Sequence, residues 1–176
     1  MNWYKIAQSI FRGDSQPMNM QDYDPEYGVK GLGKELGSSL AKGPGIYFTT
    51  NEEDAQSYGN NVSNFNINNA NIISEDSPKF TKSKITNILK SINQDLLTQA
   101  FSNWDENPYN GKILLINSIM NTENPIEQLM SIWSDVFSHQ GANDFMVLMT
   151  KNGIDGISIQ RPYSKHYVIY NRNILK

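Results

Sequence analysis

Gly43 to Tyr58, GPGIYFTTNEEDAQSY, is the stretch on which the interpretation of this chain depends. Within it, residues 45–49 form a compact apolar run of the length of a buried strand. Asn51 then stands as a helix N-cap, followed by three acidic residues in the first turn, where carboxylates suit the positive end of the helix dipole. We expect a strand joined to a helix that runs to about Tyr58 and stops at Gly59.

Two tyrosines lie at opposite ends of this unit. Tyr47 belongs to the predicted strand and Tyr58 to the end of the predicted helix. The turn between strand and helix folds the two aromatic faces back towards one another, so that a flat heteroaromatic ring could lie between them. The alternative is that both rings only pack the strand against the helix, and spacing by itself does not separate the two interpretations.

Length and composition limit the class of protein. The chain has 176 residues, of which 38% are hydrophobic, enough for one domain with a sizeable core. It has no cysteine, which excludes thiol nucleophiles, thiolate metal sites and disulfides, and its net charge of −3 provides no general basic field for nucleic acid. No apolar run reaches the length of a signal-peptide core or a membrane span. We therefore expect a soluble protein of the cytoplasm.

Segments with the pattern of strands flank a helical middle section. Strands are predicted over residues 5–12, at the alternating run 64–68, over residues 157–159 and over residues 167–170. Residues 79–150 are interpreted as a mainly helical insert whose two apolar stripes are core faces, the alternative being that the Met and Trp of the second stripe line a ligand pocket. The stripes are Ile85, Ile88, Leu89 and Ile92, and Ile126, Met130, Trp133 and Phe137. The chain is thus predicted to be an α+β protein, with a β-rich core interrupted by helices.

The segment quoted above resembles the second signature of the poly- and mono-ADP-ribose polymerases and of the diphtheria-toxin-like transferases. In that signature a G-x-G-I-Y-F strand leads to a helix whose last aromatic residue lies eleven positions after the first, as Tyr58 follows Tyr47 here. FRGDS, residues 11–15, is similar to the first signature of the same family. That likeness implies that the Gly13 backbone pairs with the nicotinamide carboxamide of NAD. It also implies that Arg12 contacts the adenosine side or the phosphates, which its forked donors suit.

The C-terminal stretch NGIDGISIQRPYSKHYVIYNRNILK resembles the last signature of phage and bacterial polyvalent-protein transferases. In that family an acidic residue opens the final strand, contacts the nicotinamide ribose and promotes transfer. Here the aligned residue is His166. A neutral imidazole could orient the ribose or act as general base for an acceptor, whereas a protonated one would repel an oxocarbenium-like ribose. The alternative is that His166 is an ordinary strand residue.

Other positions also depart from the family pattern. Ala55 stands where polymerase-like members often have a serine that bonds the carboxamide, a role that Thr49, Thr50 or Ser57 could take over. Asp14 follows Gly13, where Ser or Thr is commoner. The resemblance covers roughly residues 5–68 and 150–176 and leaves the helical insert unmatched. It implies catalytic roles for His166, Tyr47 and Arg12, and binding of NAD by Arg12, Gly13, Tyr47, Thr49, Ala55 and Tyr58.

These observations predict a single domain over residues 1–176 with an ADP-ribosyltransferase-like split β-sheet. The predicted activity is toxin-like mono-ADP-ribosyl transfer, with NAD as substrate and without a metal, to an unidentified protein or nucleic acid. We expect a monomer that does not bind membranes and works in the cytoplasm, that of the host cell if the chain is phage-encoded. One alternative is a catalytically silent module that binds NAD or ADP-ribose. Another, transfer of a phosphate from an RNA end to NAD, is disfavoured by the net charge of −3 and by only two histidines.

Overall fold

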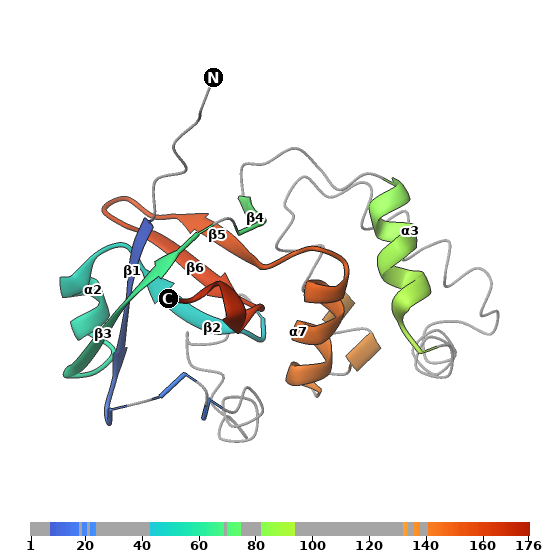
Figure 1. Ribbon diagram of the computed structural model, residues 1–176. Helices are drawn as coiled ribbons and strands as arrows, with labels where there is room; N and C mark the ends of the chain where they lie inside the picture. Colours follow the sequence, from blue (N-terminus) through green and yellow to red (C-terminus); the bar gives the residue numbers. More distant parts are fainter. Residues whose placement is uncertain are drawn as a thin grey trace.

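A mixed sheet forms the centre of the molecule, with helices at its two ends (Figure 1). The computed structural model describes residues 8–17, 19–20, 22–23, 43–68, 70–74, 82–93, 132–133, 136–137 and 141–176. The strands are β1 (Gln8–Asp14), β2 (Ile46–Thr49), β3 (Asn61–Ile67), β4 (Ile72–Ser74), β5 (Gly156–Gln160) and β6 (Lys165–Ile169). The helices are α2 (Glu52–Gln56), α3 (Lys82–Ser91), α7 (Ala142–Lys151) and the short 3-10 helix η2 (Arg172–Ile174). The expectation of a core that combines a sheet with helices is confirmed.

The six strands follow the order β3-β1-β2-β6-β5-β4. Only β4 and β5 pair in parallel, and the other neighbours are antiparallel. β1 pairs with β3 along its whole length, and β2 pairs with β6 along all of its own. In contrast, β1 and β2 share the single register pair Phe11↔Thr49. The sheet is therefore joined most weakly between β1 and β2.

Most of the strands predicted around this sheet are confirmed, with small shifts of their ends. The first strand was expected over residues 5–12, of which residues 5–7 lie outside the described part of the chain. β1 continues to Asp14 because Gly13 and Asp14 pair with Val62 and Asn61 of β3. Helix α2 has the predicted N-cap, since the Asn51 side chain accepts hydrogen bonds from the backbone N–H groups of residues 53 and 54. The helix was expected to run to about Tyr58, but it ends at Gln56 and residues 57–58 form a turn. β4 was not predicted, because its three residues become a strand only by pairing with β5.

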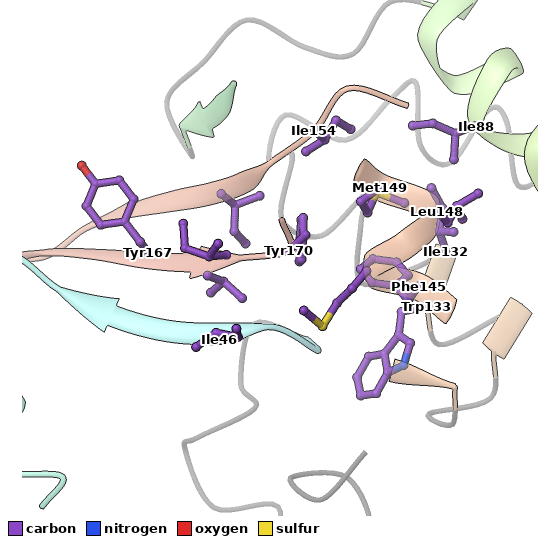
Figure 2. Packing of buried hydrophobic residues seen from close by; sticks show 14 of the residues in the cluster. Ile46, Ile88, Ile132, Trp133, Phe145, Leu148, Met149, Ile154, Tyr167 and Tyr170 are labelled. Atoms are coloured by element: carbon purple, nitrogen blue, oxygen red, sulfur yellow. The ribbon is translucent and has the colours of Figure 1, made fainter. Parts of the chain in front are cut away.

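Helices α3 and α7 belong to the segment predicted as a helical insert. The apolar stripe of α3 is buried at all its expected positions, Ile85, Ile88, Leu89 and Ile92. Of the second stripe, Trp133 is buried and Phe137 is half-buried, while Ile126 and Met130 lie outside the described residues. Phe145 of α7 and Tyr170, directly after β6, make an edge-to-face contact with ring centroids 5.7 Å apart. Figure 2 labels both among the buried side chains of the core. This contact joins α7 to the sheet. Among the described helices, none has the length and apolar character needed to cross a lipid bilayer.

Candidate functional site

The strand register places three of the predicted site residues on one face of the sheet. Thr49 of β2 lies directly opposite His166 of β6, and Tyr47 lies opposite Val168. Directly opposed residues of antiparallel strands project to the same face, and diagonal neighbours remain within reach of long side chains. Tyr47, Thr49 and His166 therefore share a face, although more than a hundred residues separate β2 from β6 in the chain.

The sheet opens between Gly13 and Tyr47. If the antiparallel register of Phe11↔Thr49 continued, Gly13 would stand opposite Tyr47, yet these two residues are not paired. The backbone groups of successive strand residues point alternately to the two neighbouring strands. The Thr50 N–H donates to the Lys165 carbonyl next to β6, so the backbone N–H and C=O groups of Thr49 point the other way, towards β1. Since Phe11 is paired with Thr49, the backbone groups of Phe11 and of Gly13, two residues on, point towards β2. The peptide groups of Gly13 consequently point into this opening.

Arg12 spans the same opening from the other face of the sheet. Its Nη1 donates to the Tyr47 carbonyl oxygen at 3.3 Å, so it bonds the backbone of Tyr47 and not its ring. Its Nε lies 3.0 Å from both carboxylate oxygens of Asp14, and its Nη2 lies 2.8 Å from one of them. The guanidinium also lies over the ring of Tyr23, 5.3 Å from its centroid. The positive charge of Arg12 is thus paired within the protein, with 16% of the side chain exposed.

Helix α2 rests directly on the end of β1. A Cβ added to Gly13 would overlap the carbonyl oxygen of Ala55, and a Cβ added to Gly59 would overlap the backbone of Asp14. Ala55 is fully buried at this contact. Since the contact is made by backbone atoms, neither partner can give way by a change of rotamer. The predicted site residues Gly13 and Ala55 are therefore brought together, and each has a packing role.

The two tyrosines of the predicted nicotinamide clamp have different surroundings. Tyr47 is half-buried, and its hydroxyl donates to the Gly43 carbonyl at 2.5 Å. Tyr58, two residues beyond the end of α2, is 59% exposed. A ring with this exposure contributes little to packing the helix against the strand, so the packing interpretation accounts for Tyr47 better than for Tyr58.

A polar cluster centred on Asp54 lies beside His166. We call it the Asp54 cluster, and its members are Thr49, Asp54, Ser164 and His166. The Asp54 Oδ2 atom lies 2.8 Å from Thr49 Oγ1, 3.2 Å from Ser164 Oγ and 2.8 Å from His166 Nε2. Thr49 is 3% exposed, and the side chains of His166 and Asp54 are 21% and 28% exposed. One carboxylate oxygen thus connects the end of β2, the start of α2 and the start of β6.

The pKa of Asp54 lies below its ordinary value of 3.8. Burial raises this pKa, but hydrogen bonds from Thr49, His166 and Ser164, together with the charge of His166, outweigh burial and lower it. Asp54 is therefore ionised at neutral pH. A carboxylate in this state is able to hold a neighbouring imidazole in a fixed orientation and to compensate a positive charge that forms on it.

Acid titration provides a direct measurement of the Asp54 cluster. Because the pKa of Asp54 is lower in the folded chain than in the unfolded one, the cluster contributes stability at pH values above 3.8 and loses it as the pH falls through the folded pKa. Denaturant unfolding at a series of pH values should show a steeper loss of stability below pH 3.8 in the wild type than in an Asp54→Asn variant. Glu53→Gln, an exposed neighbour in the same helix, should leave the wild-type slope in place. Identical slopes for wild type and Asp54→Asn would contradict the assigned hydrogen bonds.

Asp54 was not among the residues predicted for the site. In the sequence it has an ordinary explanation, as one of three acidic residues in a first helical turn. The available signal was its position three residues after the N-cap Asn51, because side chains in a first turn point back towards the preceding segment. That segment ends in Thr49, whose hydroxyl also accepts a hydrogen bond from the Asn51 N–H at 3.2 Å. The partnership with His166 required the pairing of β2 with β6, which no local pattern reveals.

An open cavity of about 300 Å³ lies elsewhere, between α7 and the C-terminal segment. Its lining includes Asn143 and Lys151 of α7 and Tyr170, Asn171, Arg172 and Asn173. None of the residues predicted for the site lines it. Within the described residues, no group of three or more His, Asp or Glu side chains is placed to hold a metal ion.

Comparison with known proteins adds no relative to this description. No protein-family model, no curated protein and no solved structure matches the chain. The geometry around Gly13, Tyr47 and the Asp54 cluster is therefore the basis on which a function can be argued.

Proposed function

We propose that the chain is an NAD-dependent mono-ADP-ribosyltransferase whose nicotinamide site lies at the opening between β1 and β2. The observation that carries this proposal is the broken pairing opposite Tyr47, where the peptide groups of Gly13 are directed at the opening. A backbone N–H and C=O that lack a strand partner are a matched donor and acceptor for a carboxamide. β1 and β2 belong to one six-stranded sheet and are joined at the single register pair Phe11↔Thr49, so the split sheet of the family resemblance stays a prediction.

The surrounding residues supply the other parts of such a site. Tyr47 borders the opening, and we expect the ring of Tyr58, which is exposed just beyond the end of α2, to cover the other face of a flat ligand. Thr49 and His166 form a register pair on the same face as Tyr47, two residues further along β2. In the proposed reaction the glycosidic bond to nicotinamide breaks, and His166 receives the proton of the group that attacks the ribose. The acceptor is a macromolecule, protein or nucleic acid, or water in its absence.

For Arg12 the expected contact with the phosphates of NAD requires a change of partners. Its guanidinium is bonded to the carboxylate of Asp14 and to the Tyr47 carbonyl. A phosphate could accept hydrogen bonds from the Arg12 guanidinium only if Arg12 gave up some of its hydrogen bonds to Asp14. We therefore assign Arg12 first to holding the opening between β1 and β2, and its contact with NAD remains a prediction.

Replacement of Tyr58 by alanine tests the clamp without disturbing the fold. Because the ring is 59% exposed, Tyr58→Ala should change the free energy of unfolding by no more than about 0.5 kcal/mol. Loss of one stacking partner costs about 1–3 kcal/mol, so the Kd for NAD measured by calorimetry should rise about fivefold to 150-fold. Tyr163→Ala is the matched control, because Tyr163 is 93% exposed in the turn between β5 and β6.

The control variant should bind NAD as the wild type does, and Tyr58→Trp should retain most of the affinity because it keeps an aromatic face. An equal loss of NAD affinity in Tyr58→Ala and Tyr163→Ala would show that Tyr58 is not part of the nicotinamide clamp. Catalysis is measured as nicotinamide release and as NAD-dependent labelling of a lysate, with Tyr47→Ala as the inactive variant. If neither release nor labelling occurs with protein, nucleic acid or water as acceptor, the proposed activity is excluded.

A silent module that binds NAD or ADP-ribose is the second candidate. It is favoured by one specific observation, the presence of His166 where the resembling family has an acidic residue. Calorimetric binding of NAD without turnover would establish this function, and the absence of any NAD binding would exclude both candidates.

A further inference from the structure

The hydrogen bond between His166 and Asp54 determines which ring nitrogen of His166 carries a proton. Nε2 lies 2.8 Å from the ionised Asp54 carboxylate, and a carboxylate can only accept. A neutral His166 is therefore protonated on Nε2, and its lone pair is on Nδ1. Among the described residues, Nδ1 has no hydrogen-bond partner, and the side chain is 21% exposed. The basic nitrogen is thus the one that faces away from Asp54.

We propose that Asp54 is a positioning residue that holds His166 as the Nε2–H tautomer, so that Nδ1 is the base of the reaction. This inference rests on the proposed transferase function and adds to it a residue for which neither the sequence pattern nor the family resemblance supplies a catalytic part. Thr49 and Ser164 complete the arrangement, because both donate to the same Asp54 oxygen and keep the carboxylate in one orientation.

The step that this arrangement supports is balanced in atoms and charge. The bond between ribose C1′ and the nicotinamide nitrogen breaks, and nicotinamide leaves as a neutral molecule with the bonding electron pair. The acceptor X–H forms a bond from X to C1′, and its proton passes to His166 Nδ1. With water as acceptor the products are ADP-ribose, nicotinamide and one proton, which His166 later releases to solvent.

Asp54 also answers the electrostatic objection to a histidine at this position. An isolated imidazolium beside the ribose would disfavour the positive charge that develops at C1′. Here the imidazolium that forms after proton transfer is bonded to a carboxylate, so the pair carries no net charge. The negative charge that the resembling family places on the final strand is supplied in this chain by α2, through His166.

Spectroscopy of the imidazole nitrogens tests the tautomer without any enzymatic assay. The chain has two histidines, so a His139→Asn variant leaves His166 as the only imidazole. In this background, isotope-labelled ring nitrogens should show Nε2–H and an unprotonated Nδ1 for the neutral form. Adding Asp54→Ala should leave a mixture of both tautomers. Adding Glu53→Ala, which removes the neighbouring exposed carboxylate, should leave the spectrum unchanged.

The kinetic arm uses nicotinamide release from NAD with water as acceptor. Asp54→Ala should lower kcat about tenfold to a hundredfold, less than the 10²- to 10⁴-fold range that general base catalysis spans. The Kd for NAD should change less than kcat, because Asp54 is bonded to His166 and to Thr49, one of the predicted NAD-binding residues, but to neither tyrosine of the clamp. Glu53→Ala should match the wild type in both quantities. A general loss of structure would weaken NAD binding as much as it lowers kcat.

The outcomes separate this inference from the proposed function. An Nδ1–H tautomer in the wild-type background, or no change of tautomer in Asp54→Ala, overturns the role of Asp54 even if the protein turns over NAD. If Asp54→Ala changes the tautomer but leaves kcat unaltered, Nδ1 is not the base and the inference fails. If the expected tautomer is found but the wild type releases no nicotinamide, the proposed function fails and the base role fails with it, whereas the fixed tautomer stands.

Discussion

Replacement of Gly13 by alanine is expected to destabilise the folded chain by at least about 3 kcal/mol, or to prevent folding. The added methyl group would overlap the carbonyl oxygen of Ala55 and approach the Gly59 carbonyl oxygen to 3.0 Å. Both are backbone atoms, so relief requires α2 to move away from β1. Denaturant unfolding measures this loss. Ser15→Ala, an exposed position two residues further along, should stay within about 0.5 kcal/mol of the wild type.

This expectation changes how a loss of activity at Gly13 should be interpreted. The family resemblance implies that the Gly13 backbone binds the carboxamide, and an inactive alanine variant would ordinarily be taken as support. The contact with Ala55 gives a second reason why the position must be glycine. Gly59→Ala separates the packing role of Gly13 from its proposed role in binding the carboxamide. The added Cβ would overlap the Asp14 backbone and so disturb the packing of α2 on β1, while Gly13 itself is unchanged. If Gly13→Ala is as stable as the wild type, the close packing of α2 on β1 is wrong.

Local patterns were sufficient to predict most elements of the sheet. The alternation of apolar and Asn residues along residues 64–68 predicted β3, and the apolar run before Asn51 predicted β2 and the start of α2. The end of β1 and the existence of β4 were missed for a common reason. Both depend on partners that the segment itself does not contain, Val62 and Asn61 for β1 and β5 for β4.

For the candidate site too, residues that belong to a local pattern could be predicted, and features that depend on a partner strand could not. Tyr47, Tyr58 and the glycine of FRGDS could be singled out because each belongs to a local spacing. The break in pairing between Gly13 and Tyr47 could not, since it is a property of two strands that meet from different parts of the chain. The same holds for Asp54, whose side chain acquires a chemical role only when β6 brings His166 to within 2.8 Å of it.

Phe145→Ala is expected to cost about 3–5 kcal/mol of stability. Phe145 is 1% exposed and makes edge-to-face contacts with Phe137 at 6.0 Å and with Tyr170 at 5.7 Å, measured between ring centroids. Its removal leaves a cavity where α7 contacts Tyr170, directly after β6, through an edge-to-face pair of rings (Figure 2). For a chain of this length the loss corresponds to a fall in Tm of about 6–20 °C.

The same variant tests whether the helices and the sheet unfold as a single domain. If they do, amide exchange in α7 and in β6 should accelerate together in Phe145→Ala, because both segments become exposed only in the shared unfolded state. Val147→Ala is the control within α7, since Val147 is 40% exposed and should shift the stability by no more than about 0.5 kcal/mol. Faster exchange in α7 with unchanged exchange in β6 would mean that the helical segment is an independent unit. In that case the sheet, with its opening between β1 and β2, would fold without the helical segment.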